Sequence, residues 1–371
     1  MPPVVHRLAP VIIALNLIAV PTVASGQVVH HFAAGKGGPP AGELTAGRDG
    51  KLYGATATGG ANGHGTIFRV DPTSPGFQVV YSFSGNDPDG AEPSGPALVE
   101  GANGVFYGTT RSGGEFGAGT LFRLTAPSTV ETIFSFPADQ ADPRGGVILG
   151  TDGRLYGTTG GGTNGFGLVY GINIDGTGFQ PFKEFAGGAD GGTPVAGVIE
   201  ARDGFLYGTT RHGSTMDVGT VFKMSKDGAF FQTLAEVNGP LGFGLTQLFD
   251  ENTHILYMYG VTGEPRDLGS LNPFALSDSI FRVRADGAPI SGNPYQQLYS
   301  FEFGHDVGFS PSGRLLLGSD GKLYGTTLVH TDRSEGCVNF GCGAVYRFNP
   351  AGGTPFAIRV FKELDGSRPA G

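Results

Sequence analysis

Leu155-Tyr156-Gly157-Thr158-Thr159 is one of six related segments, and their spacing limits the folds that this chain can adopt. Identical copies occupy 206–210 and 323–327, and looser copies occupy 52–56, 106–110 and 258–262. Their tyrosines stand at positions 53, 107, 156, 207, 259 and 324, so successive copies are 49 to 65 residues apart. Self-similarity at such a period is typical of solenoids, propellers and other repeat arrays.

Each repeat contains four short apolar runs, here named strands a, b, c and d. In the second repeat they are 96–99, 105–109, 120–124 and 131–136. Short β-branched and aromatic runs bounded by Gly, Pro and Asp predict antiparallel strands. Four strands in about 50 residues predict one propeller blade. We therefore expect an all-β propeller with six complete blades, each a four-stranded antiparallel sheet.

Two local features of the repeat lead to more detailed expectations. Asn103-Gly104 joins strands a and b, and Asp-Gly takes its place at 49–50, 152–153, 203–204 and 320–321. Asn-Gly and Asp-Gly favour type I′ turns, in which both central residues have positive φ. The glycine of Tyr-Gly-Thr predicts a close approach, and we expect an aromatic ring of the next sheet to fill that space.

Composition excludes some classes of function. The 371 residues include 67 Gly and 25 Pro, but the recurring apolar runs argue against a disordered chain. The net charge is −9, whereas nucleic-acid binding requires clustered Lys and Arg.

Arg7 and the apolar run 8–20 predict a signal peptide over 1–26. The expected protein is a propeller domain over 27–371, secreted or at the cell surface, with no membrane span after signal removal.

The two ends of the sequence bear on how the ring closes. Residues 28–32 resemble strand d without a preceding a, b and c, whereas 358–364 form another d. The final run 365–371 matches 190–197, which leads into the fourth blade. Either six blades close the ring or a seven-bladed ring is truncated, and we favour truncation. We expect 28–32 to pair as an edge strand beside the C-terminal residues of the ring.

The repeat unit resembles the GloVer tandem repeat of exported bacterial proteins. The resemblance rests on Asp-Gly-x-Leu-Tyr-Gly-Thr-Thr, Gly-Thr-x-Phe-Arg, Tyr-Ser-Phe and Asp-Gly-x-x-Pro-x-x-Gly, and it extends from about residue 28 to residue 371. It implies export and a propeller-like fold. It provides no catalytic residues to carry over to this chain.

Loops are where repeats differ, so they hold the candidate binding residues. In a propeller the d-to-a and b-to-c loops emerge on one face, here called the loop face. The candidate ligand contacts on it are His64, Asp89, Arg111, Glu115, Asp190, Arg211, His212 and His330. The aspartates, among which Asp87-Pro88-Asp89-Gly90 is the best fragment, either stabilise turns or bind Ca²⁺. We predict no other cofactor.

Two carboxylates depart from the repeat near the a-to-b turn, Glu100 and Glu200. Because strand a lines the central channel of a propeller, they are an acid/base pair, a metal site or simply solvated strand ends. Cys337 and Cys342 predict a disulfide within a short loop, because the exported compartment is oxidising.

Two functions follow from these features. The favoured one is an extracellular binding or surface-structural propeller whose partner is a glycan or a protein. The alternative is a carbohydrate-active or lactone-hydrolysing enzyme that works at the channel mouth.

Overall fold

The computed structural model describes residue 38 and residues 41–73, 76–85, 87–125, 128–213, 218–263, 278–302, 307–329 and 343–361. The regular structure of these residues is β apart from two 3-10 turns, at Ala102–Gly104 and Ala138–Gln140. No helix in this part is long and apolar enough to cross a membrane. The expected strand at 28–32, His330 and both cysteines lie outside the described residues.

The strands form six four-stranded sheets. Blade one contains β1 (Thr45–Ala46), β2 (Leu52–Thr56), β3 (Thr66–Asp71) and β4 (Gly76–Ser82). Blade two contains β5 (Gly90–Glu100), β6 (Phe106–Gly113), β7 (Thr120–Thr125) and β8 (Thr129–Ser135). Blade three contains β9 (Val147–Leu149), β10 (Arg154–Thr159), β11 (Leu168–Asn173) and β12 (Gln180–Glu184). Blade four contains β13 (Ile199–Glu200), β14 (Leu206–Thr210), β15 (Gly219–Met224) and β16 (Phe231–Val237). Blade five contains β17 (Thr246–Asp250), β18 (Ile255–Val261), β19 (Ser279–Arg284) and β20 (Gln296–Ser300). Blade six contains β21 (Phe309–Leu317), β22 (Leu323–Val329), β23 (Ala344–Phe348) and β24 (Phe356–Val360).

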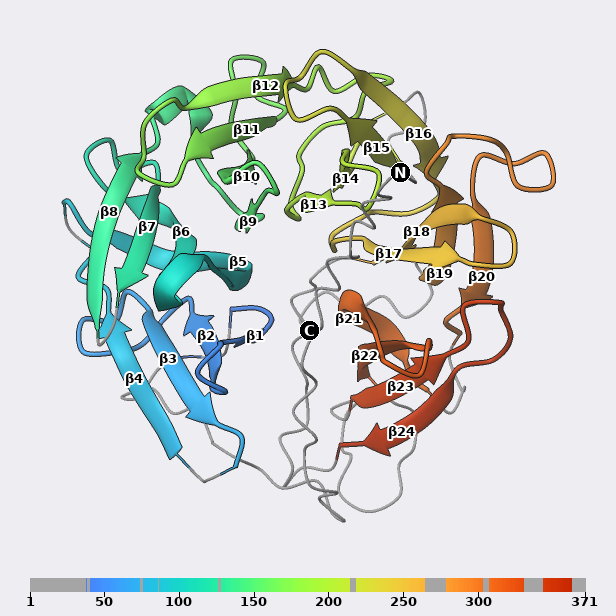
Figure 1. Ribbon diagram of the computed structural model, residues 1–371, viewed down its shortest axis with the longest axis horizontal. Coiled ribbons are helices and arrows are strands. Elements are labelled where there is room, and N and C mark those ends of the chain that lie inside the picture. Colours follow the sequence, from blue (N-terminus) through green and yellow to red (C-terminus); the bar gives the residue numbers. More distant parts are fainter. Residues whose placement is uncertain are drawn as a thin grey trace, which may run out of the picture.

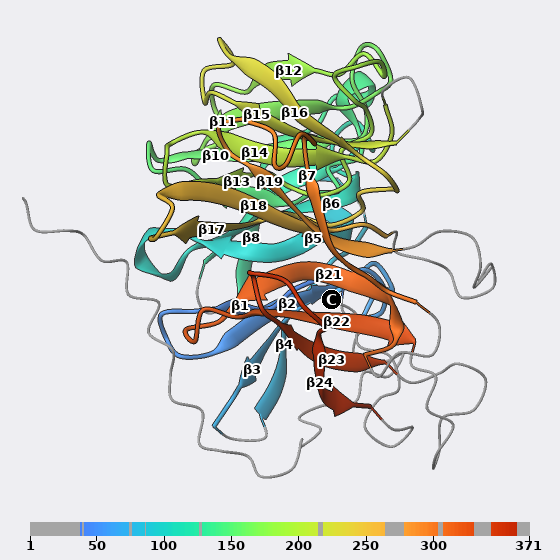
Figure 2. The same cartoon turned by 90° about the vertical axis from the view of Figure 1, so that its right-hand side faces the viewer.

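The six sheets stand around a ring, with the first strand of each sheet innermost and the last outermost (Figure 1). Figure 2 shows the same ring from the side. Neighbouring strands are antiparallel and consecutive in sequence within every blade, as in blade four. The prediction of an all-β propeller with six four-stranded antiparallel blades is confirmed.

The glycine of Tyr-Gly-Thr lies against an aromatic ring, but the ring belongs to strand c of the same blade. Gly208 pairs with Phe222 across strands β14 and β15. A Cβ atom on Gly208 would lie 2.4 Å from Cζ of Phe222. Equivalent close approaches, of 2.4 to 2.6 Å, occur at Gly54, Gly108, Gly157, Gly260 and Gly325. The expectation of a ring from the next sheet is therefore wrong, because the two residues face each other within one sheet.

The Asp-Gly turns also differ from the sequence expectation. Asn103 and Gly104 both have positive φ, 57° and 72°, as a type I′ turn requires. In the four Asp-Gly copies positive φ is confined to the glycine. The aspartate instead accepts a hydrogen bond from the repeat tyrosine, as Asp203 does from Tyr207 at 2.6 Å. The same contact joins the pairs Asp49–Tyr53, Asp152–Tyr156 and Asp320–Tyr324.

The two threonines of the repeat point to different partners. Thr209 donates to the carbonyl oxygen of Phe243, which leads into blade five, at 3.2 Å. Thr210 shares a 2.7 Å hydrogen bond with Thr220 on strand c, and all three threonines are buried. The first threonine therefore links adjacent blades, and the second satisfies a buried hydroxyl within its own blade.

We predict that Gly208→Ala destabilises the propeller by about 1–3 kcal/mol, because a methyl group there overpacks against Phe222. Urea unfolding of the purified variant measures this change. Gly188→Ala is the matched control, since nothing lies within 4 Å of a Cβ atom at that position. Equal stability of the two variants would contradict the packing argument.

Candidate functional site

The d-to-a and b-to-c loops do meet on one face of the ring. The backbone N–H of Glu92 donates to the carbonyl oxygen of His64 at 3.0 Å, joining blades two and one. Thr193 donates in the same way to Phe166 at 2.7 Å, joining blades four and three. Both donors have positive φ, near 55°, and both precede proline. These two d-to-a loops are thus fixed to the preceding blades, and the expected loop face is present.

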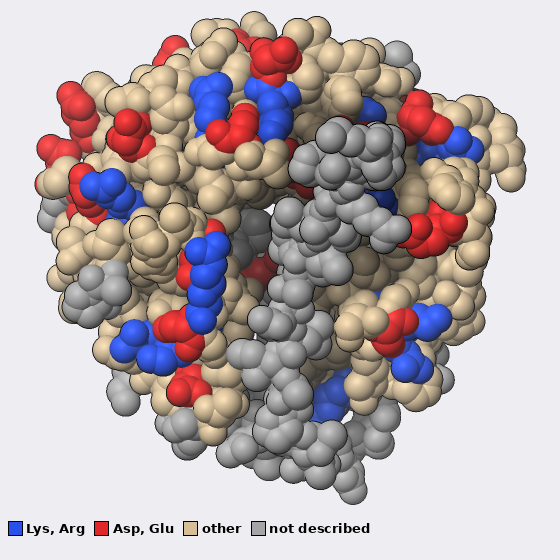
Figure 3. Space-filling model, viewed as in Figure 1, with Lys and Arg blue, Asp and Glu red and all other residues tan. Residues whose placement is uncertain are grey.

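Arg111 belongs to an ion-pair network at the junction of blades two and three. Its Nε lies 3.1 Å from Asp142 Oδ1, and its Nη1 lies 3.9 Å from Glu92 Oε2. Arg144 contacts the other oxygen of Asp142. Small mixed groups of acidic and basic side chains also recur around the opposite face of the ring, which carries the a-to-b and c-to-d turns (Figure 3). Arg111 is nevertheless partly exposed, so one side of its guanidinium faces solvent.

His64 has a counterpart in blade three, and the comparison shows what its ring contacts. The ring of His64 lies against Gly85, and the ring of Phe166 lies against Gly187 in the matching loop. Both side chains cover a glycine of the d-to-a loop that follows. His64 is therefore a packing residue of the loop face that also remains exposed.

Asp89 and Asp190 each bind groups of their own loop or of the strand d that leads into it. Asp89 Oδ2 accepts from Ser84 N at 2.6 Å and from the hydroxyl of Tyr81 at 3.1 Å. Burial, followed by the nearby charge and hydrogen bond of Asp89, raises the pKa of Tyr81 to about 12. Asp190 Oδ2 accepts from Lys183 at 2.6 Å. These contacts favour the turn-stabilising interpretation, and the described residues contain no group of three or more His, Cys, Asp or Glu placed to hold a metal ion.

The remaining loop candidates occupy two b-to-c loops. Arg211 and His212 pair through their backbones with Thr193 and Gly192, which enter the same blade. Glu115 is exposed at the tip of the blade-two loop, where its N–H donates to Ser135 Oγ at 3.2 Å.

Glu100 and Glu200 each bind the a-to-b turn of the preceding blade. Glu100 accepts from the backbone N–H of Arg48 at 3.0 Å. Glu200 accepts from Thr151 N at 2.8 Å and from Lys226 Nζ at 2.8 Å. The two carboxylates thus serve separate junctions, between blades one and two and between blades three and four.

The pKa of Glu200 reflects these contacts. Partial burial acts to raise it, but the hydrogen bonds from Lys226 and Thr151 together outweigh burial and hold the pKa below its ordinary value. Gln247 occupies the equivalent strand position in blade five and accepts from Arg202 N at 2.9 Å. A neutral amide can therefore also accept a hydrogen bond from the backbone N–H of the preceding turn. This contact between blades was not predicted from the sequence.

Two exposed aromatic residues on the loop face were not predicted from the sequence. Phe116 is 53 % exposed and Phe166 is 43 % exposed. They lie in the b-to-c loops of neighbouring blades, beside Glu115 and against Gly187 respectively. The available signal was an aromatic residue followed by glycine in loops whose other residues are small or polar.

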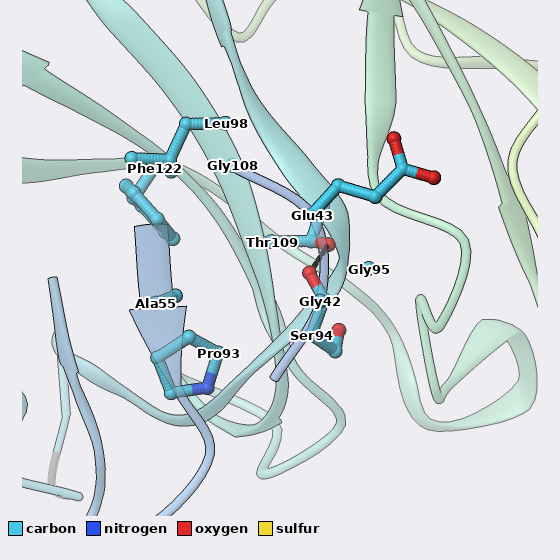
Figure 4. Close-up of a pocket in the computed structure, with 10 residues that line it drawn as sticks. All are labelled: Gly42, Glu43, Ala55, Pro93, Ser94, Gly95, Leu98, Gly108, Thr109 and Phe122. Carbon is cyan, nitrogen blue, oxygen red and sulfur yellow. Dashed lines mark hydrogen bonds between the residues drawn. The ribbon is translucent and has the colours of Figure 1, made fainter. Parts of the chain in front are cut away.

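A small hollow lies between blades one and two, lined by Glu43, Pro93, Leu98 and Phe122 among others (Figure 4). Its interior has room for about one water molecule. The carboxylate of Glu43 points away from the other lining side chains and pairs with Arg314 of blade six at 2.8 Å. The hollow is too small for a sugar or peptide ligand.

The sequence matches the profile of the Gloeobacter/Verrucomicrobia repeat over residues 17–159 and 98–286. The chain belongs to this repeat family. The match covers most of the chain. It agrees with the Tyr-Gly-Thr unit that recurs in this sequence.

Comparison with solved structures supports the propeller fold of this Gloeobacter/Verrucomicrobia repeat protein. Hydrazine synthase of Kuenenia stuttgartiensis is 12 % identical, with a TM-score of 0.52 over 85 % of this chain and 80 % of the other. A protein from Lactobacillus plantarum is 14 % identical, with a TM-score of 0.50 over 89 % and 85 %. At this identity the similarity concerns the fold alone. No curated protein matches the sequence.

We predict that Glu200→Gln lowers stability at pH 7 by about 1–2 kcal/mol, because it removes the charge that binds Lys226. The folded-state pKa of Glu200 is depressed, so its contribution is present above the ordinary value of 4.5 and is lost as pH falls through the folded value. Urea unfolding at several pH values between 7 and 3 measures this dependence.

Glu100→Gln is the matched control, since its contact is a backbone N–H that an amide can also accept. We expect a smaller change at pH 7 for this variant. A Glu200→Gln penalty that stays constant down to pH 3 would contradict the electrostatic role.

Proposed function

We propose that this repeat propeller is an exported binding module whose loop face holds an extracellular polysaccharide. The observation that carries the proposal is the pair of exposed aromatic side chains, Phe116 and Phe166, on neighbouring loops. Aromatic and arginine side chains supply much of the binding energy at protein interfaces. An exposed aromatic ring also offers a flat apolar surface to the face of a sugar ring.

The surroundings of these rings support a preformed surface. Phe166 rests on Gly187, and its backbone carbonyl accepts from the next blade, so its position is tied to the ring. Arg111 is oriented by Asp142 while remaining partly exposed, and it lies near the end of β6, which leads into the loop of Phe116. A preformed site avoids part of the entropy cost of binding. Charged groups at its edge can hydrogen-bond the hydroxyl or carboxylate groups of a polysaccharide.

Export of the protein is part of the same proposal. It is supported by the signal-peptide pattern of residues 1–26 and by what the family resemblance implies. A polysaccharide of the cell wall or extracellular matrix is the ligand that such a protein would meet.

The test is binding of the purified protein to an array of glycans and isolated cell-wall polysaccharides. We expect at least one polysaccharide to bind, and Phe116→Ala to weaken that binding by about tenfold or more. Phe230→Ala is the matched control, because Phe230 is similarly exposed but lies at the c-to-d turn on the other face. Equal losses in the two variants would contradict a loop-face site.

Two other outcomes would replace the proposal. Capture of a protein ligand without any glycan would identify a protein partner. Turnover of a sugar or lactone would favour the enzymatic alternative.

A further inference from the structure

Three consecutive blades each present an exposed ring-bearing side chain on the loop face. Blades one, two and three follow one another around the propeller (Figure 1). Their b-to-c loops carry His64, Phe116 and Phe166, and all three side chains are exposed. His64 occupies the place in blade one that Phe166 occupies in blade three, two residues before strand c. The loop face therefore carries a row of three rings, one on each of three adjacent loops.

Backbone hydrogen bonds join the loops that hold the first two rings. The d-to-a loop 83–92 lies between them. The N–H of Glu92 donates to the carbonyl oxygen of His64 at 3.0 Å. At the other end of the same loop, the carbonyl oxygen of Asp89 accepts from the N–H of Gly114 at 3.0 Å. The loops of His64 and Phe116 are thus attached to one shared segment.

The next d-to-a loop, 136–146, connects the second ring to the third in a related way. The N–H of Asp142 donates to the carbonyl oxygen of Ala118 at 3.2 Å, and the N–H of Gly160 donates to the carbonyl oxygen of Asp142 at 2.8 Å. Because stacked sheets lie about 10 Å apart, the rings of neighbouring blades are separated by roughly that distance or more. The fold therefore fixes the spacing of the row before any ligand binds.

The space beside each ring is open. Every ring has a neighbouring glycine in the sequence at which an added Cβ atom would meet nothing within 4 Å. These glycines are Gly63, Gly117 and Gly165. A ligand that lies on one ring can therefore continue past it toward the next. Recognition of a chain end would require walls that enclose it, whereas these loop tips are open.

The charges between the rings are balanced by pairing. Arg111 and Arg144 both contact Asp142, and Arg111 also lies 3.9 Å from Glu92. Glu115, beside Phe116, is exposed and forms no ion pair within the described part of the chain. The whole chain has a net charge of −9. Such a surface disfavours an acidic sugar chain and is compatible with an uncharged one.

We infer that the row of three rings binds an internal segment of a long, uncharged sugar chain. The inference rests on the proposed function and specifies its ligand. Each flat ring offers an apolar surface to one face of a sugar. A long chain contacts all three rings at once, and the later contacts are intramolecular, so they raise the affinity without new types of interaction. A short sugar reaches a single ring and gains nothing from the row.

The dependence of affinity on chain length tests this inference. Isothermal titration calorimetry compares disaccharides with octasaccharides prepared from cellulose, xylan and mannan, and polygalacturonate is the charged counterpart. We expect at least one octasaccharide to bind about tenfold or more tightly than its disaccharide. Reduction of its terminal sugar to an alditol should leave the affinity unchanged, because the chain end makes no contact.

Several results would overturn the inference. Equal affinity for the two lengths, or tighter binding of polygalacturonate, would contradict it while leaving glycan binding at the loop face in place. Binding of none of these chains would also contradict it. In that case the glycan array decides whether the proposed function falls as well.

Two reciprocal substitutions test the rings while preserving the packing of their loops. His64→Phe copies blade three, where Phe166 rests on Gly187, and Phe166→His copies blade one, where His64 rests on Gly85. Both arrangements already exist in this fold, so both variants should keep the melting temperature of the parent protein. We expect His64→Phe to tighten octasaccharide binding by about threefold or more and Phe166→His to weaken it by a similar factor, because a phenyl ring offers the more apolar face. Changes in the same direction, or no change in either variant, would contradict the inference.

Discussion

The contact between the repeat glycine and the aromatic ring of strand c is the constraint on which each blade depends. At Gly208 a single added carbon would lie 2.4 Å from the ring of Phe222, so no other residue fits without displacing that ring. The aromatic ring fills the centre of the sheet face that contacts the preceding blade. The repeat tyrosine and the strand-c aliphatic residue fill the face that contacts the next blade. A blade built in this way has two apolar faces and cannot bury either one alone. The ring of blades follows from this requirement.

Polar residues of the repeat mainly supply hydrogen-bond partners for the hydroxyl groups that packing buries. Asp203 fixes the hydroxyl of Tyr207, and Thr210 pairs with Thr220 where both hydroxyls are buried. Buried hydroxyls without partners would cost stability at every blade, so these residues recur with the apolar ones. Residues free to recognise a ligand are therefore those of the loops, where repeats differ in length and composition.

Much of the fold could be predicted from the sequence because a repeat multiplies a weak signal. One copy of Tyr-Gly-Thr is uninformative, whereas six copies with four apolar runs each predicted the blades, their strand order and the shared face of the loops. Contacts between different repeats could not be predicted in this way. Glu200 looked like a channel carboxylate, but its partners, Thr151 and Lys226, come from the preceding blade and from a hairpin of its own blade. Phe116 was overlooked because exposure depends on the whole loop rather than on residue type.

Native-state hydrogen exchange, measured strand by strand, tests most directly the claim that blades stabilise one another through paired faces. Amides of blades two to five, which are covered on both sides, should exchange slowly and with similar protection. Amides of β22 and β23 should exchange faster, because the apolar face of blade six that carries Leu316 and Ile358 is exposed. Equal protection of all six blades would contradict the account, since it would show that a blade does not need both neighbours.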